Sequence, residues 1–209
     1  MEIITFETWS FGSNTYLLKN DDNKEAVLID AGVEGSKVLE AIEKDELTLR
    51  AILFTHGHPD HLIGAAEIAK ETGAPSYMHP IDAEMLKVIA PMFSQVLGMP
   101  ELEMPDEFLP LEDGQVLELA GFKLEVFLTP GHSQGSVCFL VEDVLFSGDL
   151  IFRGSIGRTD FPGGSMDILL DSVKNKVFTL PNDTRILSGH MDPTVVGWEK
   201  RTNPFLTGL

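Results

Sequence analysis

The spacing of apolar residues predicts alternating strands and helices in the first half of the chain. Short apolar or alternating runs bounded by turn-forming residues are typical of strands, whereas apolar residues three or four positions apart are typical of helices. Strands are therefore expected at residues 3–8, 14–19, 25–29, 51–54 and 75–78. Helices are expected at residues 34–46, from about Asp60 to Gly73, and at residues 82–89.

Residues 91–110 break both patterns, because this segment contains four prolines and three methionines. A connection of this length is typical of a lid or a binding loop, and a plain surface excursion with its apolar residues tucked into the core fits equally well. Beyond it, strands are expected at residues 115–119, 122–128, 137–141, 144–146 and 185–187, helices at 166–178 and 195–201, and a glycine-rich loop at 154–164. With no linker or repeat in the pattern, residues 1–209 are expected to form a single domain.

Composition narrows the classes of function. An apolar fraction of 43% and a charged fraction of 23% are typical of a soluble globular protein. No apolar stretch approaches the roughly 20 residues of a membrane helix, and no basic region followed by an apolar one opens the chain, so no secretion signal is predicted. The single cysteine, Cys138, excludes an internal disulfide framework and fits a reducing compartment, so a cytoplasmic location is predicted.

The charge balance opposes binding to nucleic acid. Fifteen basic residues face 33 acidic ones, for a formal charge of −18, whereas a surface that follows phosphates needs clustered lysine and arginine. We therefore expect no nucleic-acid partner and no membrane partner. An anionic small substrate stays compatible with this charge, because bound cations can invert the local potential. The pattern leaves a monomer and a homo-oligomer equally open.

The strongest chemical signal is the stretch from Thr55 to Leu62, which reads T-H-G-H-P-D-H-L. Three histidines and an aspartate fall within six positions there. Imidazole and carboxylate groups are the usual ligands of zinc and of other first-row metals. Because the stretch directly follows the predicted strand at residues 51–54, its side chains can converge on one point. A polar turn that happens to contain histidines is the alternative interpretation.

Three more predicted strands end in the same way, with a small or turn-forming residue followed by a potential ligand. These ligands are His132, Asp149 and His190. The carboxyl ends of strands are where α/β architectures place active sites. Asp30 also follows a predicted strand and is expected to hydrogen-bond loop backbone beside the metal loop. Cys138 lies inside an apolar strand and is expected to be a buried, inert thiol.

These side chains can fill two metal positions. The first is offered His56, His58 and His132, and the second is offered Asp60, His61 and His190. Asp149 is the natural bridge, because one carboxylate can give an oxygen to each ion. Two divalent ions about 3.5–4 Å apart would share a hydroxide and lower its pKa from 15.7 to about 7. The predicted reaction is therefore metal-assisted hydrolysis of an ester, thioester or amide, with zinc favoured and iron or manganese as alternatives.

Five motifs together resemble the metallo-β-lactamase superfamily, and within it the single-domain glyoxalase II-like hydrolases of the hydroxyacylglutathione hydrolase type. They are T-H-G-H-P-D-H at 55–61, T-P-G-H-S-Q-G-S at 129–136, S-G-D-L-I-F at 147–152, G-R-T-D-F at 157–161 and S-G-H at 188–190. The resemblance covers essentially the whole chain. It implies an α/β (α+β) fold, a four-layer αββα sandwich with the metals at one edge, and the same seven metal ligands.

The resemblance also implies roles beyond metal binding. Asp60 would be catalytic by orienting the metal-bound hydroxide, and Arg158 would contact the thiol part of the substrate, a salt bridge to Asp160 being the alternative for that arginine. The implied function is hydrolysis of a small-molecule thioester such as S-lactoylglutathione. One alternative is a mononuclear iron persulfide dioxygenase that uses His56, His132 and Asp149. Another is a metallo-hydrolase of a different ester or lactone.

Overall fold

The computed structural model describes residues 1–8, 12–97 and 101–209, and it contains two six-stranded sheets within these ranges. In spatial order, the first sheet consists of β1 (Glu2–Glu7), β2 (Asn14–Asn20), β3 (Glu25–Ile29), β4 (Thr48–Leu53), β5 (Ser76–Met78) and β6 (Leu109–Pro110). The second consists of β14 (Thr194–Val195), β13 (Arg185–Ser188), β10 (Val144–Gly148), β9 (Val137–Val141), β8 (Phe122–Leu128) and β7 (Val116–Leu119). A small hairpin is formed by β11 (Ile151–Phe152) and β12 (Ser155–Ile156).

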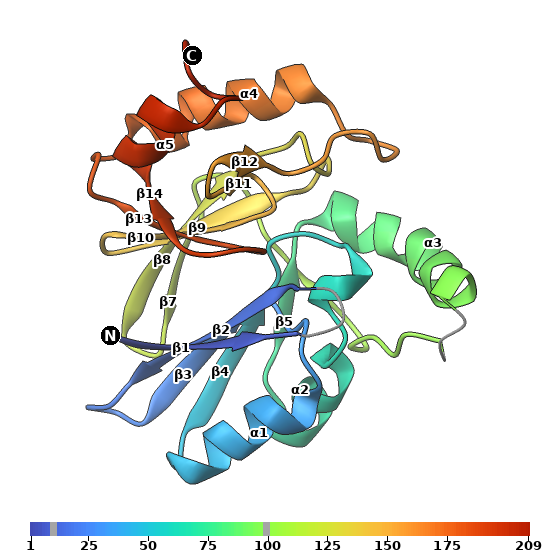
Figure 1. Ribbon diagram of the computed structural model, residues 1–209. Coiled ribbons are helices and arrows are strands. Elements are labelled where there is room, and N and C mark those ends of the chain that lie inside the picture. The colour runs from blue at the N-terminus through green and yellow to red at the C-terminus, as the bar shows by residue number, and fades with distance from the viewer. Residues whose placement is uncertain (9–11, 98–100) are drawn as a thin grey trace.

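Helices cover the outer face of each sheet. Figure 1 shows α1 (Gly35–Lys44) and α2 (Ala65–Thr72) outside the first sheet, with α3 (Pro80–Leu97) at its side, and α4 (Met166–Asn175) and α5 (Val196–Thr202) outside the second. Short 3₁₀ helices lie at Pro59–His61 and Val177–Thr179. The fold is therefore the four-layer αββα sandwich that the sequence motifs imply.

The alternation of side chains along the strands explains the four layers, because successive residues of a strand point to opposite faces of its sheet. In β4, Leu53 belongs to the core between the two sheets, whereas Ile52 packs in the cluster beneath the outer helices. In β10, Phe146 points into the same inter-sheet core and Leu145 packs toward α4. The inner strands β4 and β10 are thus buried on two faces near the site, whereas β8 alternates between buried and exposed residues.

Strand directions bring the predicted ligands to one edge. In the second sheet, β9 pairs antiparallel with both β8 and β10, and β10 pairs parallel with β13. The carboxyl ends of β8, β10 and β13 therefore lie at the same edge. Backbone hydrogen bonds link the two sheets there, from Val137 to the carbonyl oxygen of Thr55 at 2.8 Å and from Asn14 to that of Gly189 at 2.7 Å.

The prediction of an irregular segment from residue 91 is wrong for its first part. Helix α3 continues through Pro91 to Leu97, although a proline in a helix interior costs about 3 kcal/mol. Leu86, Ala90 and Ser94 follow one another at four-residue intervals and are all buried, so the inner face of the helix runs on past the proline and offsets this cost. Residues 98–100, which also belong to the irregular segment of the sequence, lie outside the described ranges.

The helix expected from Asp60 to Gly73 is divided in two. A 3₁₀ turn at Pro59–His61 is followed by α2, which begins only at Ala65. Gly64, between them, lies so close to the chain at Val33 that a Cβ atom would overlap its carbonyl oxygen. The division leaves the last two ligands of the metal loop on a separate turn. Elsewhere the predicted strands and helices are present with small shifts at their ends.

Among the described residues, none of the helices has both the length and the apolar character needed to span a bilayer.

Truncation of the inter-sheet core should cost much of the stability. Phe146 is fully buried, and its ring packs against Tyr16 with the centroids 5.3 Å apart. We expect Phe146→Ala to lower the free energy of unfolding by about 3–5 kcal/mol, measured by urea denaturation of the metal-free protein. Val116→Ala is the control, because Val116 is 54% exposed and should change stability by only about 0.5 kcal/mol. Equal effects of the two variants would contradict a core shared by both sheets.

Candidate metal centre

All seven predicted ligands lie together at the sheet edge. They form three overlapping groups, and within each group the possible ligand atoms all lie within 4.8 Å of one another. The groups are His56, His58 and His132; His56, His61 and Asp149; and Asp60, His61 and His190. The first and third match the two predicted metal positions, and the second joins them. That these residues bind metal stays a prediction.

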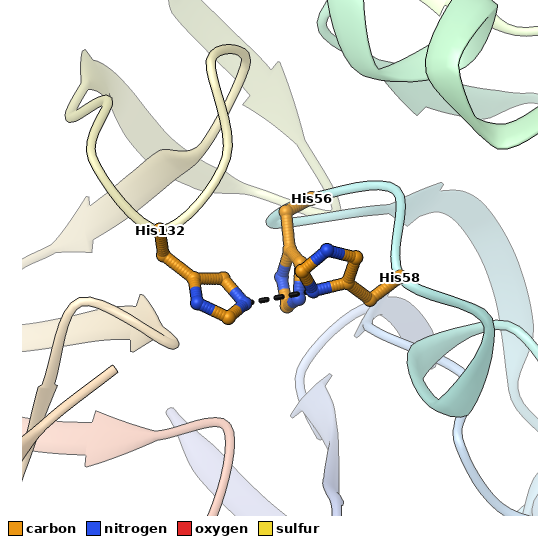
Figure 2. Close-up of side chains that lie close together, drawn as sticks. All are labelled: His56, His58 and His132. Atoms are coloured by element: carbon orange, nitrogen blue, oxygen red, sulfur yellow. Dashed lines mark hydrogen bonds between the residues drawn. The ribbon is translucent and has the colours of Figure 1, made fainter. Parts of the chain in front are cut away.

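The first group, shown in Figure 2, combines two loops that are distant in sequence. His56 and His58 lie on the loop after β4, and His132 lies on the loop after β8. The Nε2 atom of His132 and the Nδ1 atom of His58 are 2.7 Å apart. Two ring nitrogens at this distance can share one proton, or both can turn their lone pairs toward one cation.

Asp149 lies between the two positions. Its Oδ1 atom is 3.5 Å from the Nε2 atom of His61, and its Oδ2 atom is 3.5 Å from the Nε2 atom of His132. The Nε2 atom of His190 also lies 3.5 Å from Oδ2, and 3.4 Å from a carboxylate oxygen of Asp60. One carboxylate therefore lies within 3.5 Å of histidines from both groups, where a bridging ligand would lie.

Buried polar atoms without partners test whether these residues fit a metal. Three such atoms at this edge make no hydrogen bond in the structure: Nε2 of His56, Nε2 of His61 and Oδ1 of Asp149. A buried polar group is normally paired, because leaving it unpaired costs roughly 1–3 kcal/mol. All three atoms can donate a lone pair, and divalent cations would satisfy them together. The donor set therefore fits a pair of divalent metal ions.

In three of these histidines, the ring nitrogen that faces away from the metal position is hydrogen-bonded to the protein. His61 donates from Nδ1 to Asp30 at 2.9 Å, His132 to the carbonyl oxygen of Arg158 at 2.8 Å, and His190 to that of Gly12 at 3.0 Å. Such hydrogen bonds fix the tautomer and direct Nε2 toward a metal. The rings are thus held in their ligating orientation by backbone and carboxylate acceptors.

Asp30 supports both metal positions, which the sequence did not predict. The expected hydrogen bond to loop backbone is confirmed, because the Thr55 amide donates to Oδ1 at 2.8 Å. In addition, Oδ2 accepts from the ring of His61 and from the hydroxyl of Thr55, whose oxygen lies 3.0 Å from Nδ1 of His56. The chain has φ 55° at Asp30, a left-handed conformation that non-glycine residues rarely adopt. The sequence signal for this role was the position of an acidic residue directly after the buried strand β3, which pairs with β4.

Asp82 also supports the ligand loops, and the sequence analysis did not predict this role. Its side chain is fully buried and accepts hydrogen bonds from the amides of Gly57 at 2.9 Å and Gly135 at 2.7 Å, and from the hydroxyl of Ser133 at 2.6 Å. A Cβ atom on either glycine would press against Asp82. Because Gly57 separates two ligands and Ser133 follows another, this carboxylate fixes both loops of the first group.

Burial makes two histidines of the first group neutral. Together with the neighbouring histidines, it lowers the pKa of His58 to about 3 and holds the pKa of His56 well below its usual range. Both rings are neutral at pH 7, which is the form in which histidine binds metals.

Carboxylates dominate the second group. Burial alone would lower the pKa of His61, but three carboxylates outweigh it and raise this pKa to about 10. They belong to Asp60, Asp30 and Asp149. The proton on His61 thus neutralises surrounding negative charge, a role that a divalent cation can take over. Burial raises the pKa of Asp60, but His61 and His190 outweigh it, so the net shift is downward and this side chain is ionised.

Arg158 lies beside the site but is already paired. Its guanidinium group makes two hydrogen bonds to Asp160, at 2.8 and 2.7 Å, and its Cζ atom lies 3.8 Å from the centre of the Phe161 ring. The salt bridge considered as the alternative for this arginine is therefore present. Arg158 also lines a pocket of about 710 Å³ that opens onto the metal-ligating residues, so a contact with substrate stays a prediction.

Cys138 is buried, as expected, and burial raises the pKa of its thiol to about 12. A thiol in this state is a poor nucleophile. The reactive groups at this edge are therefore imidazoles and carboxylates.

Two facing sheets with a histidine and aspartate cluster at one edge define the class of metallo-hydrolases. The family model of the metallo-beta-lactamase superfamily matches residues 9–190, and the chain belongs to this superfamily. It is 36% identical to hydroxyacylglutathione hydrolase GloC of Haemophilus influenzae over 99% of this chain and 98% of that protein. It is also similar to BLEG-1 B3 metallo-beta-lactamase, with a TM-score of 0.90 and 37% identity over 99% of this chain and all of that one. A di-iron-bound form of TTHA1623 has a TM-score of 0.86 and 36% identity, covering 97% of this chain and all of that one.

Removal of one ligand should remove one metal. We expect the protein to bind two divalent ions per chain and His58→Ala to retain one, because the first group then offers only two imidazoles, with most of the hydrolytic activity lost. Metal content measured by mass spectrometry after desalting checks the stoichiometry. His79→Ala is the matched control, since His79 belongs to none of the three groups. Two tightly bound ions and full activity in His58→Ala would contradict the assignment of the first group.

Loss of the carboxylate behind His61 should weaken the second metal. We expect Asp30→Asn to lower the affinity of the second position for its metal ion about 10–100-fold, since hydrogen-bond partners of ligating histidines typically contribute that much. Competition with a chromogenic chelator measures both binding steps. Asp45→Asn is the control, because Asp45 pairs with Lys19 and belongs to none of the metal-ligating groups. Unchanged affinity in Asp30→Asn would exclude this supporting role.

Proposed function

We propose that this protein is a dinuclear metal-dependent hydrolase that cleaves a thioester by attack of water on the carbonyl carbon. The observation that carries the proposal is the position of Asp149, whose carboxylate lies 3.5 Å from a histidine of the first metal position and from two histidines of the second. A carboxylate placed in this way can bridge two adjacent ions, and the pocket that the ligands line leaves room for solvent or substrate.

Two divalent ions held by these residues would supply a water of lowered pKa and would polarise the substrate carbonyl. The protein supplies the rest of the arrangement. Asp60 is ionised and can accept a hydrogen bond from the attacking water, which orients it toward the carbonyl carbon. The buried supports Asp30 and Asp82 keep the ligating rings in place, so little reorganisation is needed during the reaction.

A thioester suits this site because of its leaving group. Attack of water on the carbonyl carbon breaks the C–S bond and yields a carboxylic acid and a thiol. A thiolate leaves without a proton from a general acid, whereas an amine needs one. Apart from Arg158 and the predicted metal ligands, the described residues that line the pocket have apolar side chains. The relative named hydroxyacylglutathione hydrolase supports the same reaction class.

The function predicts metal-dependent turnover of S-D-lactoylglutathione, which can be followed by the loss of thioester absorbance. We expect activity in the protein loaded with zinc, iron or manganese, loss of activity after chelation, and recovery when two equivalents of metal are returned. No metal-dependent turnover of any thioester would reject the proposal. A single bound iron with oxygen uptake on a persulfide would instead identify a dioxygenase, and turnover of nitrocefin alone would identify a β-lactamase.

A further inference from the structure

The pocket beside the metal-ligating residues has one strongly apolar wall. With about 710 Å³, it falls in the range of small-molecule sites, which is roughly 300–1,000 Å³. Helix α3 contributes Met85, Val88, Ile89, Met92 and Phe93 to this wall. Phe161 and Pro162 face it from the loop after β12. The floor consists of predicted metal ligands, so a substrate bound there can place its reacting carbonyl beside these ligands and its remainder against α3.

Helix α3 is apolar on two sides, and only one of them packs in the core. Leu86 and Ala90 are buried under the first sheet. Val88 and Met92, one turn apart on another side, are 64% and 59% exposed although both line the pocket. Exposed apolar side chains grouped at the mouth of a site mark a surface that a ligand covers.

Apart from the metal ions that the ligands would hold, the pocket offers little positive charge to an anionic carrier. Arg158 is the one cationic side chain of lysine or arginine type among the described lining residues, and Asp160 neutralises it through two hydrogen bonds. Stacking on Phe161 holds the guanidinium further in that position. Glutathione brings two carboxylates and would have to compete with Asp160 for this arginine. An uncharged apolar group meets no such competition.

We propose that the pocket selects thioesters with an apolar, medium-length acyl chain, which packs along α3, and that it makes no use of a charged thiol carrier. This inference rests on the proposed thioesterase function and names its substrate class. The acyl chain buries Val88 and Met92, and the carrier needs to supply only its sulfur atom.

Thioesters of N-acetylcysteamine, an uncharged thiol, test the acyl preference directly. Acetyl, butyryl and hexanoyl thioesters are compared on the metal-loaded enzyme. We expect kcat/KM to rise about fourfold for each added methylene until the pocket is filled, the factor that follows from burying one methylene. A flat or falling series, with turnover retained, would overturn the inference and leave the hydrolase function standing. No turnover of any thioester would reject the function itself.

The carrier is tested with the lactoyl group held constant. S-D-lactoylglutathione and S-D-lactoyl-N-acetylcysteamine differ only in the thiol, and we expect their kcat/KM values to agree within about threefold. A preference for glutathione of tenfold or more would overturn the inference. The variant Arg158→Ala tests the cause of such a preference. Loss of the preference in this variant would show that Arg158 binds the glutathione carrier.

Variants on α3 test the wall itself. Val88→Gln and Met92→Gln should lower the ratio of hexanoyl to acetyl kcat/KM about tenfold, mainly through KM, with two metals still bound. The matched control is Val96→Gln, since Val96 lies one turn further along, is 81% exposed and does not line the pocket. Calorimetry with the non-hydrolysable thioether S-hexyl-N-acetylcysteamine gives a readout without turnover, and Met92→Gln should weaken its binding about tenfold. If Val96→Gln lowers activity as much and also dissociates an oligomer in size-exclusion chromatography, the α3 face is an interface between copies and the inference fails.

Discussion

The buried carboxylate of Asp30 is the group on which both metal positions depend. It accepts hydrogen bonds from the amide and hydroxyl of Thr55 and from the ring of His61. The hydroxyl of Thr55 is in turn hydrogen-bonded to the ring of His56. The left-handed backbone at Asp30 costs about 1–3 kcal/mol, which the surrounding hydrogen bonds must offset. Two ligands from different positions are thus oriented by one side chain, so the spacing between the positions is a property of the fold rather than of flexible loops.

The charge arrangement at this edge follows from the same constraint. At the first position, burial suppresses the protonation of His56 and His58, and at the second, carboxylates gather around His61. Each arrangement would be costly in a dry protein interior without positive charge, because buried lone pairs and buried carboxylates both need partners. Cations would satisfy both together, and Asp149 lies where it could share the charge between them.

Local sequence predicted most of the fold and the members of the site, because strand runs and the ligands that follow them are encoded by neighbouring residues. Periodicity could not show that β4 and β10 belong to different sheets that face each other, since pairing is a long-range property. The extension of α3 past Pro91 was also hidden, because its compensation comes from tertiary burial of Ala90 and Ser94. The contact of Asp30 with His61 and the role of Asp82 were hidden for a similar reason, as the partners lie 25 or more positions away in the chain.

Helix α3 connects the chemistry of the site to its choice of substrate. Asp82, in its first turn, holds the loops that carry His58 and His132 through Gly57 and Ser133. Further along, the same helix presents Val88 and Met92 to the pocket. The helix is continuous over this length, and Pro91 removes only one of the backbone hydrogen bonds that fix each turn on the one before. A group packed along α3 therefore lies at a fixed distance from the first metal position. Changes on the exposed side of the helix alter what fits beside the metals, while the buried carboxylate at its start keeps the ligand loops in place.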